Sequence, residues 1–190
     1  MNPLRPESAD LLREIVNIGA SQSSGVLAAR VGRPVRISVP VLRELELQEA
    51  AEVFGPPADP VEAIFCIASG TFQAGLLLGL PEAEGRRLRN ALGIDETDQE
   101  GLEAPLAEVL RIFFEAAATF LMAELEPEVS RRVYDMAGSL LPSLIAELEY
   151  DIESLWLAEV DFVTQETSVF GRLFFLADGA FYALIDRMAG

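Results

Sequence analysis

Four polar residues near the start of the chain are spaced so that a helix would bring them onto one side. They are Asp10, Glu14, Asn17 and Ser21. Because a helix turns by about 100° per residue, these side chains fall within about 60° of its circumference. A carboxylate would then stand beside a carboxamide, which offers both a donor and an acceptor and can orient a water molecule. The same spacing also fits an ordinary solvent-exposed helix face, and spacing alone does not choose between the two.

The composition of the 190-residue chain excludes several other kinds of chemistry. All 14 basic residues are arginine, there is no histidine, and Cys66 is the single cysteine. No lysine is present to form a Schiff base, and no histidine is present to act as a general base or metal ligand. Cys66 lies in an apolar run, which predicts a buried strand cysteine rather than a nucleophile. We therefore expect no metal site and no cofactor of the chain's own.

The charge and hydropathy of the chain restrict its partners and its location. The formal net charge is −17 and the pI is about 4.3, which argues against binding to nucleic acid or to an anionic membrane. No apolar run approaches the roughly 20 residues of a membrane span. The first ten residues contain no apolar signal core. These features predict a cytoplasmic protein with no membrane span.

The order of the expected elements repeats once along the chain. Periodicity and turn residues predict helices at residues 10–30, 82–92, 102–125, 136–148 and 180–188, and strands at 34–41, 61–69, 73–80, 129–134, 155–163 and 169–176. The run Gly-Leu-Leu-Leu-Gly-Leu at 75–80 is echoed by Gly-Arg-Leu-Phe-Phe-Leu at 171–176. We expect a single α+β domain made of two repeats, at about residues 8–93 and 102–190. Each half runs helix, strands, helix, and the halves are related by a pseudo-two-fold axis, with long helices packed on a mostly antiparallel sheet.

Several segments resemble the CheC-like family of chemotaxis phosphatases. Residues 10–19, Asp-Leu-Leu-Arg-Glu-Ile-Val-Asn-Ile-Gly, resemble its signature, and residues 32–34 and 37–40 continue the likeness. Residues 134–138 resemble the start of its second repeat, so the resemblance covers nearly the whole chain. CheC, CheX and the CheC-like part of the flagellar switch protein FliY share this architecture, which leaves the subfamily open. The resemblance implies a phosphatase that hydrolyses the aspartyl phosphate of a phosphorylated CheY-like response regulator.

The resemblance also gives roles to the residues of the first helix. It implies that Asn17 orients the attacking water and that Glu14 pairs with a lysine of the regulator, so these two form the catalytic pair. Asp10 matches the first motif position and is expected to support the site, although an acidic residue is also favoured at a helix start by the macrodipole. The Mg²⁺ that the reaction needs is expected on the partner regulator.

The second repeat carries a degenerate copy of the motif. Its positions are Ala104, Glu108 and Arg111, so the carboxamide is replaced by a guanidinium that donates hydrogen bonds but accepts none. We expect this second site to be inactive. Phe113 and Phe114 are adjacent and are not both expected to point into one core, so Phe114 is expected to face a neighbouring helix or a partner.

Two functions from different classes stay open at this point. The first is the response-regulator phosphatase. The second is a non-catalytic adaptor or flagellar-switch component that binds the phosphorylated regulator or the receptor deamidase CheD. The intact pair Glu14 and Asn17 favours the first function. The lost second site and the net charge of −17 favour the second, because a phosphorylated receiver is itself acidic around its site.

Overall fold

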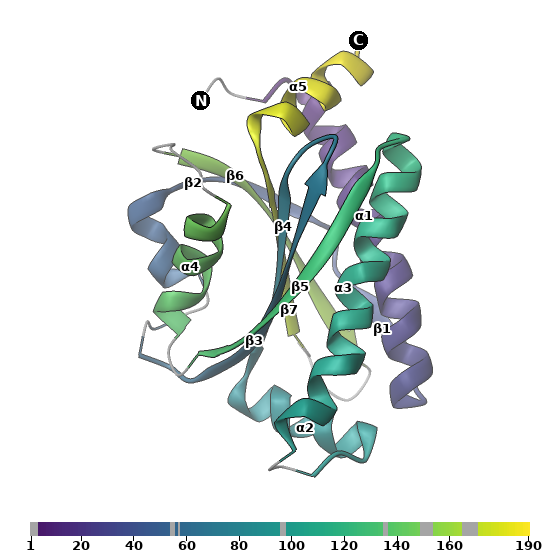
Figure 1. The fold of residues 1–190 in the computed structure, drawn as a ribbon, viewed down its shortest axis with the longest axis vertical. Helices are drawn as coiled ribbons and strands as arrows, with labels where there is room; N and C mark the ends of the chain where they lie inside the picture. Colours follow the sequence, from purple (N-terminus) through teal and green to yellow (C-terminus); the bar gives the residue numbers. More distant parts are fainter. Residues whose placement is uncertain are drawn as a thin grey trace.

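Helices and strands alternate along the chain in an α+β fold, shown in Figure 1. The computed structural model describes residues 4–53, 56, 58–95, 98–134, 137–148, 154–164 and 171–190. Its helices are α1 (Pro6–Val31), α2 (Glu82–Leu92), α3 (Gln99–Leu121), α4 (Leu140–Glu147) and α5 (Gly179–Met188), with the short 3-10 helices η1 (Leu47–Glu52) and η2 (Ala137–Ser139). Its strands are β1 (Val35–Ile37), β2 (Val41–Glu46), β3 (Val61–Gly70), β4 (Ala74–Pro81), β5 (Leu125–Tyr134), β6 (Ser154–Thr164) and β7 (Gly171–Ala177). None of the helices in this described part has the length and apolar run that a membrane crossing needs.

The strands form one antiparallel sheet in which the two halves of the chain are interleaved. The order is β1-β6-β7-β4-β3-β5, and β2 also pairs with β6. The outer strands β1 and β2 of the first half therefore pair with β6 of the second half, while β5 of the second half pairs with β3 of the first. The two inner strands, β4 and β7, meet at the centre of the sheet.

The register of β4 against β7 obeys the expected two-fold symmetry. Matching the repeated runs makes Leu77 equivalent to Leu173 and Leu78 equivalent to Phe174. Leu77 pairs with Phe174, and Leu78 pairs with Leu173, so exchanging the two halves leaves the pairing unchanged. This confirms the duplicated, pseudo-two-fold arrangement of helices on an antiparallel sheet.

The sheet is buried on both faces, which explains the continuous apolar runs of its central strands. Along β3, Ile64 and Cys66 belong to the core under the long helices, while Ala63 and Phe65 belong to a second core on the opposite face. Figure 1 shows α1 and α3 side by side on the first face and α4 on the other. The prediction of a buried strand cysteine at Cys66 is confirmed.

Several expected boundaries are wrong, among them the start of β5 at Leu125 rather than residue 129 and the start of α4 at Leu140 rather than residue 136. The predicted strand 34–41 is interrupted, because β1 ends at Ile37 and β2 begins at Val41; Val39 between them is 79% exposed. The predicted helix 102–125 is also too long, because α3 ends at Leu121 with Met122 in the left-handed region at φ 50°. β5 then begins at Leu125, since pairing with β3 continues to the end of that neighbouring strand.

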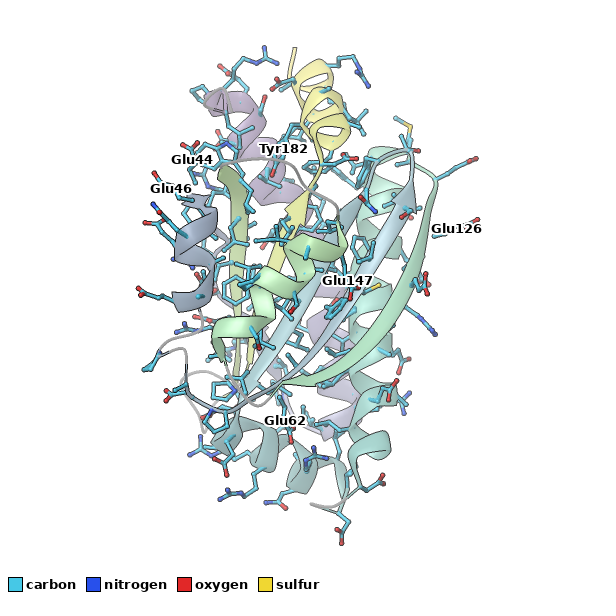
Figure 2. All side chains as sticks on the ribbon, turned by 60° about the vertical axis from the view of Figure 1, so that its left-hand side comes forward. Glu44, Glu46, Glu62, Glu126, Glu147 and Tyr182 are labelled. Atoms are coloured by element: carbon cyan, nitrogen blue, oxygen red, sulfur yellow. The ribbon has the colours of Figure 1, made fainter. Side chains whose placement is uncertain are left out.

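A partly buried ion pair fixes α2 to the sheet and to the start of α3. The Arg89 side chain is 6% exposed, and its Nη2 lies 2.6 Å from Oε1 of Glu62 on β3. Its Nη1 donates to the carbonyl oxygen of Asp98 at 2.9 Å, and Asp98 is the N-cap residue of α3. Gly85 makes this approach possible, because a Cβ there would lie 2.8 Å from the Glu62 carboxylate. Figure 2 shows Glu62 near the foot of the sheet, beside α2.

Candidate functional site

The first helix provides a rigid platform for the candidate site. Pro6 occupies the first turn of α1, and Gly32 ends the helix in the left-handed conformation at φ 69°. One face of α1 is buried along its whole length, by residues that include Leu12, Ile15 and Leu27. The direction of the opposite face is therefore fixed by packing.

The four polar residues predicted to share a face do so. Asp10, Glu14, Asn17 and Ser21 are all exposed on α1. Asp10 accepts a hydrogen bond from Arg13 at 2.7 Å, which neutralises part of its charge. In the part of the chain that the structure describes, no hydrogen bond or ion pair engages the side chain of Glu14 or Asn17. The carboxylate and the carboxamide are thus open to a partner from solvent.

α1 is locked against α3 in an antiparallel arrangement. Near the crossing, buried Ser23 donates a hydrogen bond to the carbonyl oxygen of Val109 at 2.7 Å. At the N-terminal end, Ser8 donates a hydrogen bond to the carboxylate of Asp186 on α5. These contacts hold α1 at both its middle and its start, so Glu14 and Asn17 lie between two anchored points.

The second, degenerate site differs from the first in more than sequence. Ala104 and Arg111 are exposed on α3, as expected for an outward stripe. Glu108, however, is engaged by Arg30 from the end of α1, whose Nη2 and Nε lie 2.5 Å and 3.1 Å from Oε2. The glutamate of the second site is therefore paired within the chain, whereas Glu14 has no ion pair among the described residues.

The expectation that the two adjacent phenylalanines would not both point into one core is wrong, because both are buried in the core under the long helices. Phe113 is 0% exposed and Phe114 is 1% exposed, and their ring centroids lie 5.9 Å apart in an edge-to-face arrangement. The core around α3 extends over more than one side of the helix, since α1, β3 and β5 all pack against it. Phe114 therefore has no freedom to meet a partner.

An apolar groove between α1 and α3 was not predicted from the sequence. It has a volume of about 480 Å³, and its lining includes Ile18, Gln22, Ile112, Ala116 and Phe120. Ile18 directly follows Asn17, and Ile112 directly follows Arg111. The sequence signal that could have predicted the groove is the apolar residue that follows the last motif position in each half.

The electrostatics of the described residues offer no other catalytic group. No cluster of three or more His, Cys, Asp or Glu side chains in the described ranges is arranged to hold a metal ion. Burial raises the pKa of the Cys66 thiol to about 12. The positive charge of Arg111 lowers this pKa and the negative charge of Glu128 raises it, but burial is the largest cause. A thiol with such a pKa stays protonated and is a poor nucleophile.

Comparisons with known proteins give one curated relative and several solved structures. No family model matches the chain. The chain is 27% identical over 158 residues to the CheY-P phosphatase CheC of Bacillus subtilis (strain 168), covering 77% of this chain and 76% of that protein. Its fold is similar to that of FliY from Thermotoga maritima, with a TM-score of 0.69, 15% identity and coverage of 97% of this chain and 95% of the other. It is also similar to the FliM middle domain from H. pylori, with a TM-score of 0.68, 11% identity and coverage of 97% and 100%.

Proposed function

We propose that this chain, which resembles the CheC-like family, is a phosphatase for the aspartyl phosphate of a CheY-like response regulator. The observation that carries the proposal is the open pair Glu14 and Asn17 on the anchored helix α1. Both side chains are exposed on a platform whose opposite face is buried. The similarity to the CheY-P phosphatase CheC supports the same class of substrate.

In the proposed reaction, Asn17 positions a water molecule in line with the scissile P–O bond. Its amide oxygen accepts a hydrogen bond from the water, so that a lone pair of the water oxygen faces the phosphorus atom. The new P–O bond forms as the bond to the aspartyl oxygen breaks, and the products are the free aspartate carboxylate, inorganic phosphate and a proton. Asn17 is too weak a base to take that proton, so its contribution is orientation.

Glu14 is proposed to dock the regulator rather than to react. A carboxylate without an ion pair in the described structure is available to a lysine of the partner. The carboxylate of Asp10 already accepts a hydrogen bond from Arg13, so we assign it only a supporting role. The Mg²⁺ is proposed to belong to the regulator, and we propose no metal bound by this chain.

The test is phosphate release from a CheY-like receiver domain that has been phosphorylated with a small-molecule phosphodonor. We expect the protein to accelerate release, and Asn17→Ala to remove about 2–4 kcal/mol of transition-state stabilisation while leaving binding intact. Asn90→Ala is the matched control, because Asn90 is an exposed asparagine on a different helix, α2. Equal rates for Asn17→Ala and the wild type would refute the mechanism.

The same experiment separates the phosphatase from its competitor. The second function is a non-catalytic adaptor or flagellar-switch component, and the fold similarity to FliY is compatible with it. An adaptor would bind the phosphorylated receiver without accelerating phosphate release. Binding without acceleration, across the receivers tested, would therefore favour the adaptor. Binding of CheD is compatible with either function and does not distinguish them.

A further inference from the structure

A second hollow lies at the edge of the sheet, away from the helix that carries Glu14 and Asn17. It has a volume of about 630 Å³ and opens between the end of α3 and the start of β5. Phe114, Ala118 and Leu125 form apolar parts of its wall. In the described sheet, β5 is an edge strand that pairs only with β3, so this side of the molecule is open.

The rim of this hollow is acidic, and no cation among the described residues compensates its charges. Glu115, Glu124 and Glu126 line the hollow, and all three are exposed. Figure 2 shows Glu126 pointing away from the edge of the sheet. No ion pair joins these carboxylates to a cation within the ranges that the structure describes, not even to Arg111, which lies one turn before Glu115 on α3. A cationic partner would relieve the repulsion among them.

An apolar side chain stands in solvent beside this rim. Met122 is 90% exposed, and it caps α3 in a left-handed conformation that glycine normally adopts at such a cap. A methionine side chain is flexible and polarisable, which suits an apolar contact with a partner. Met122 directly precedes Ala123 and Glu124, which line the hollow, so it offers an exposed apolar group next to it.

The backbone around the rim is fixed before any partner arrives. The amide of Thr71, in the turn between β3 and β4, donates to the carbonyl oxygen of Glu124 at 2.9 Å, and the amide of Glu124 donates to Oγ1 of Thr71 at 3.1 Å. The amide of Ala123 donates to the carbonyl oxygen of Ala118 at 2.9 Å. The surface is therefore preorganised, and little conformational entropy would be lost from this backbone when a partner binds.

We propose that this hollow docks a cationic peptide segment of another protein. An apolar side chain of the segment packs against Ala118 and Leu125 in the hollow and against Met122 beside it, while its arginine or lysine side chains pair with the glutamates of the rim. A second copy of this chain is a poor occupant, because its net charge is also −17. The docking surface is formed by α3 and β5, so it does not depend on the proposed phosphatase site on α1.

The test is the binding of a labelled peptide of arginine and leucine to the full chain, followed by fluorescence anisotropy and by the NMR signal of the Met122 methyl group. We expect the methyl signal to shift, and the double variant Glu124→Arg with Glu126→Arg to weaken binding at least about tenfold. The matched control is Glu52→Arg with Asp59→Arg, which changes the net charge equally at exposed positions outside the hollow. We expect less than about threefold weakening for the control, because distant surface charges are screened.

Two outcomes would overturn the proposal. Equal weakening by both double variants would show that the peptide responds only to net charge. Self-association of the wild type that disappears in Glu124→Arg with Glu126→Arg, measured by sedimentation, would show that the occupant is a second copy. Circular dichroism of both variants checks that they fold, and Met122→Glu provides an independent variant because its side chain is in solvent.

Discussion

Gly19 of α1 lies directly against the ring of Phe113 of α3. A Cβ built on Gly19 would come within 2.7 Å of Cδ2 of that ring, which is closer than real Cβ atoms approach. Gly19 stands at the same distance along the chain from Glu14 as Phe113 does from Glu108, so the two are equivalent residues of the two halves. Where the pseudo-two-fold axis brings them together, one half supplies a phenylalanine ring and the other a glycine, which has no side chain to clash with it.

This contact predicts opposite effects for two glycine substitutions in the same helix. Gly19→Ala should destabilise the protein by about 1–3 kcal/mol, because Phe113 is 0% exposed and has no space to move. Gly25→Ala should stabilise it by about 0.5–1 kcal/mol, because nothing lies within 4 Å of a Cβ there and alanine favours a helix. Urea unfolding of both variants checks the prediction. Equal changes in the free energy of unfolding would show that the close approach does not matter.

Charge reversal at Glu14 should weaken binding of the phosphorylated regulator more than truncation does. Glu14→Ala removes one attractive pair, whereas Glu14→Lys sets a positive charge against the lysine of the partner. An exposed pair is worth about 0–1 kcal/mol, and a desolvated one at an interface can cost more when it is broken. Isothermal titration with the phosphorylated receiver measures the difference, with Glu52→Lys as the control for net charge. Wild-type affinity in Glu14→Lys would show that this helix face is only solvated surface.

Restoring the second site should require two changes rather than one. In an Asn17→Ala background, Arg111→Asn replaces the missing carboxamide, but Glu108 remains paired with Arg30. We expect a modest gain in phosphate release from Arg111→Asn, and a further gain when Arg30→Gln releases the carboxylate. The two side chains are 54% and 41% exposed, so the pair is worth at most about 1 kcal/mol and the further gain at most about fivefold. Full wild-type activity from Arg111→Asn alone would mean that the halves remained equivalent.

The thiol of Cys66 should make the stability of the protein depend on pH in alkaline solution. Burial raises its pKa from 9.0 to about 12, so in folded protein it stays protonated where the unfolded chain would release the proton. The stabilisation is complete below pH 9 and is lost as the pH rises from about 9 towards 12. Comparing urea unfolding of the wild type and Cys66→Ala at pH 8 and pH 10.5 checks this sign. Rapid reaction of the native thiol with a disulfide reagent at pH 8 would contradict the burial that causes the shift.

Local signals made parts of the fold predictable. The bounds of α2 match the predicted residues 82–92. Gly93 ends the helix in a left-handed conformation that glycine adopts readily, so the end of the helix could be read from the sequence. The end of α3 was not predictable in this way, since the residues after Leu121 continue a composition that favours helix. Met122 adopts a conformation that glycine favours, and pairing with β3 then extends β5 back to Leu125.

The candidate site was predictable only as far as its residues share one helix. The exposed face with Glu14 and Asn17 follows from the period of α1, and the structure places it as expected. The pairing of Arg30 with Glu108 joins the end of one helix to the middle of another, and no local pattern encodes such a contact. The groove behind Ile18 likewise depends on how α1 crosses α3.

The exchange of outer strands between the halves bears on how such a chain could have arisen. Because β1 and β2 pair with β6, and β5 pairs with β3, neither half covers the edge of its own inner strands. A half-length ancestor with this fold would have needed a second copy of itself, as a homodimer with swapped strands. In a homodimer, one sequence must fit both halves of the fold. After fusion of two copies into one chain, each half could change its sequence independently. One helix could then keep a glutamate and an asparagine while its twin came to carry an arginine in place of the asparagine.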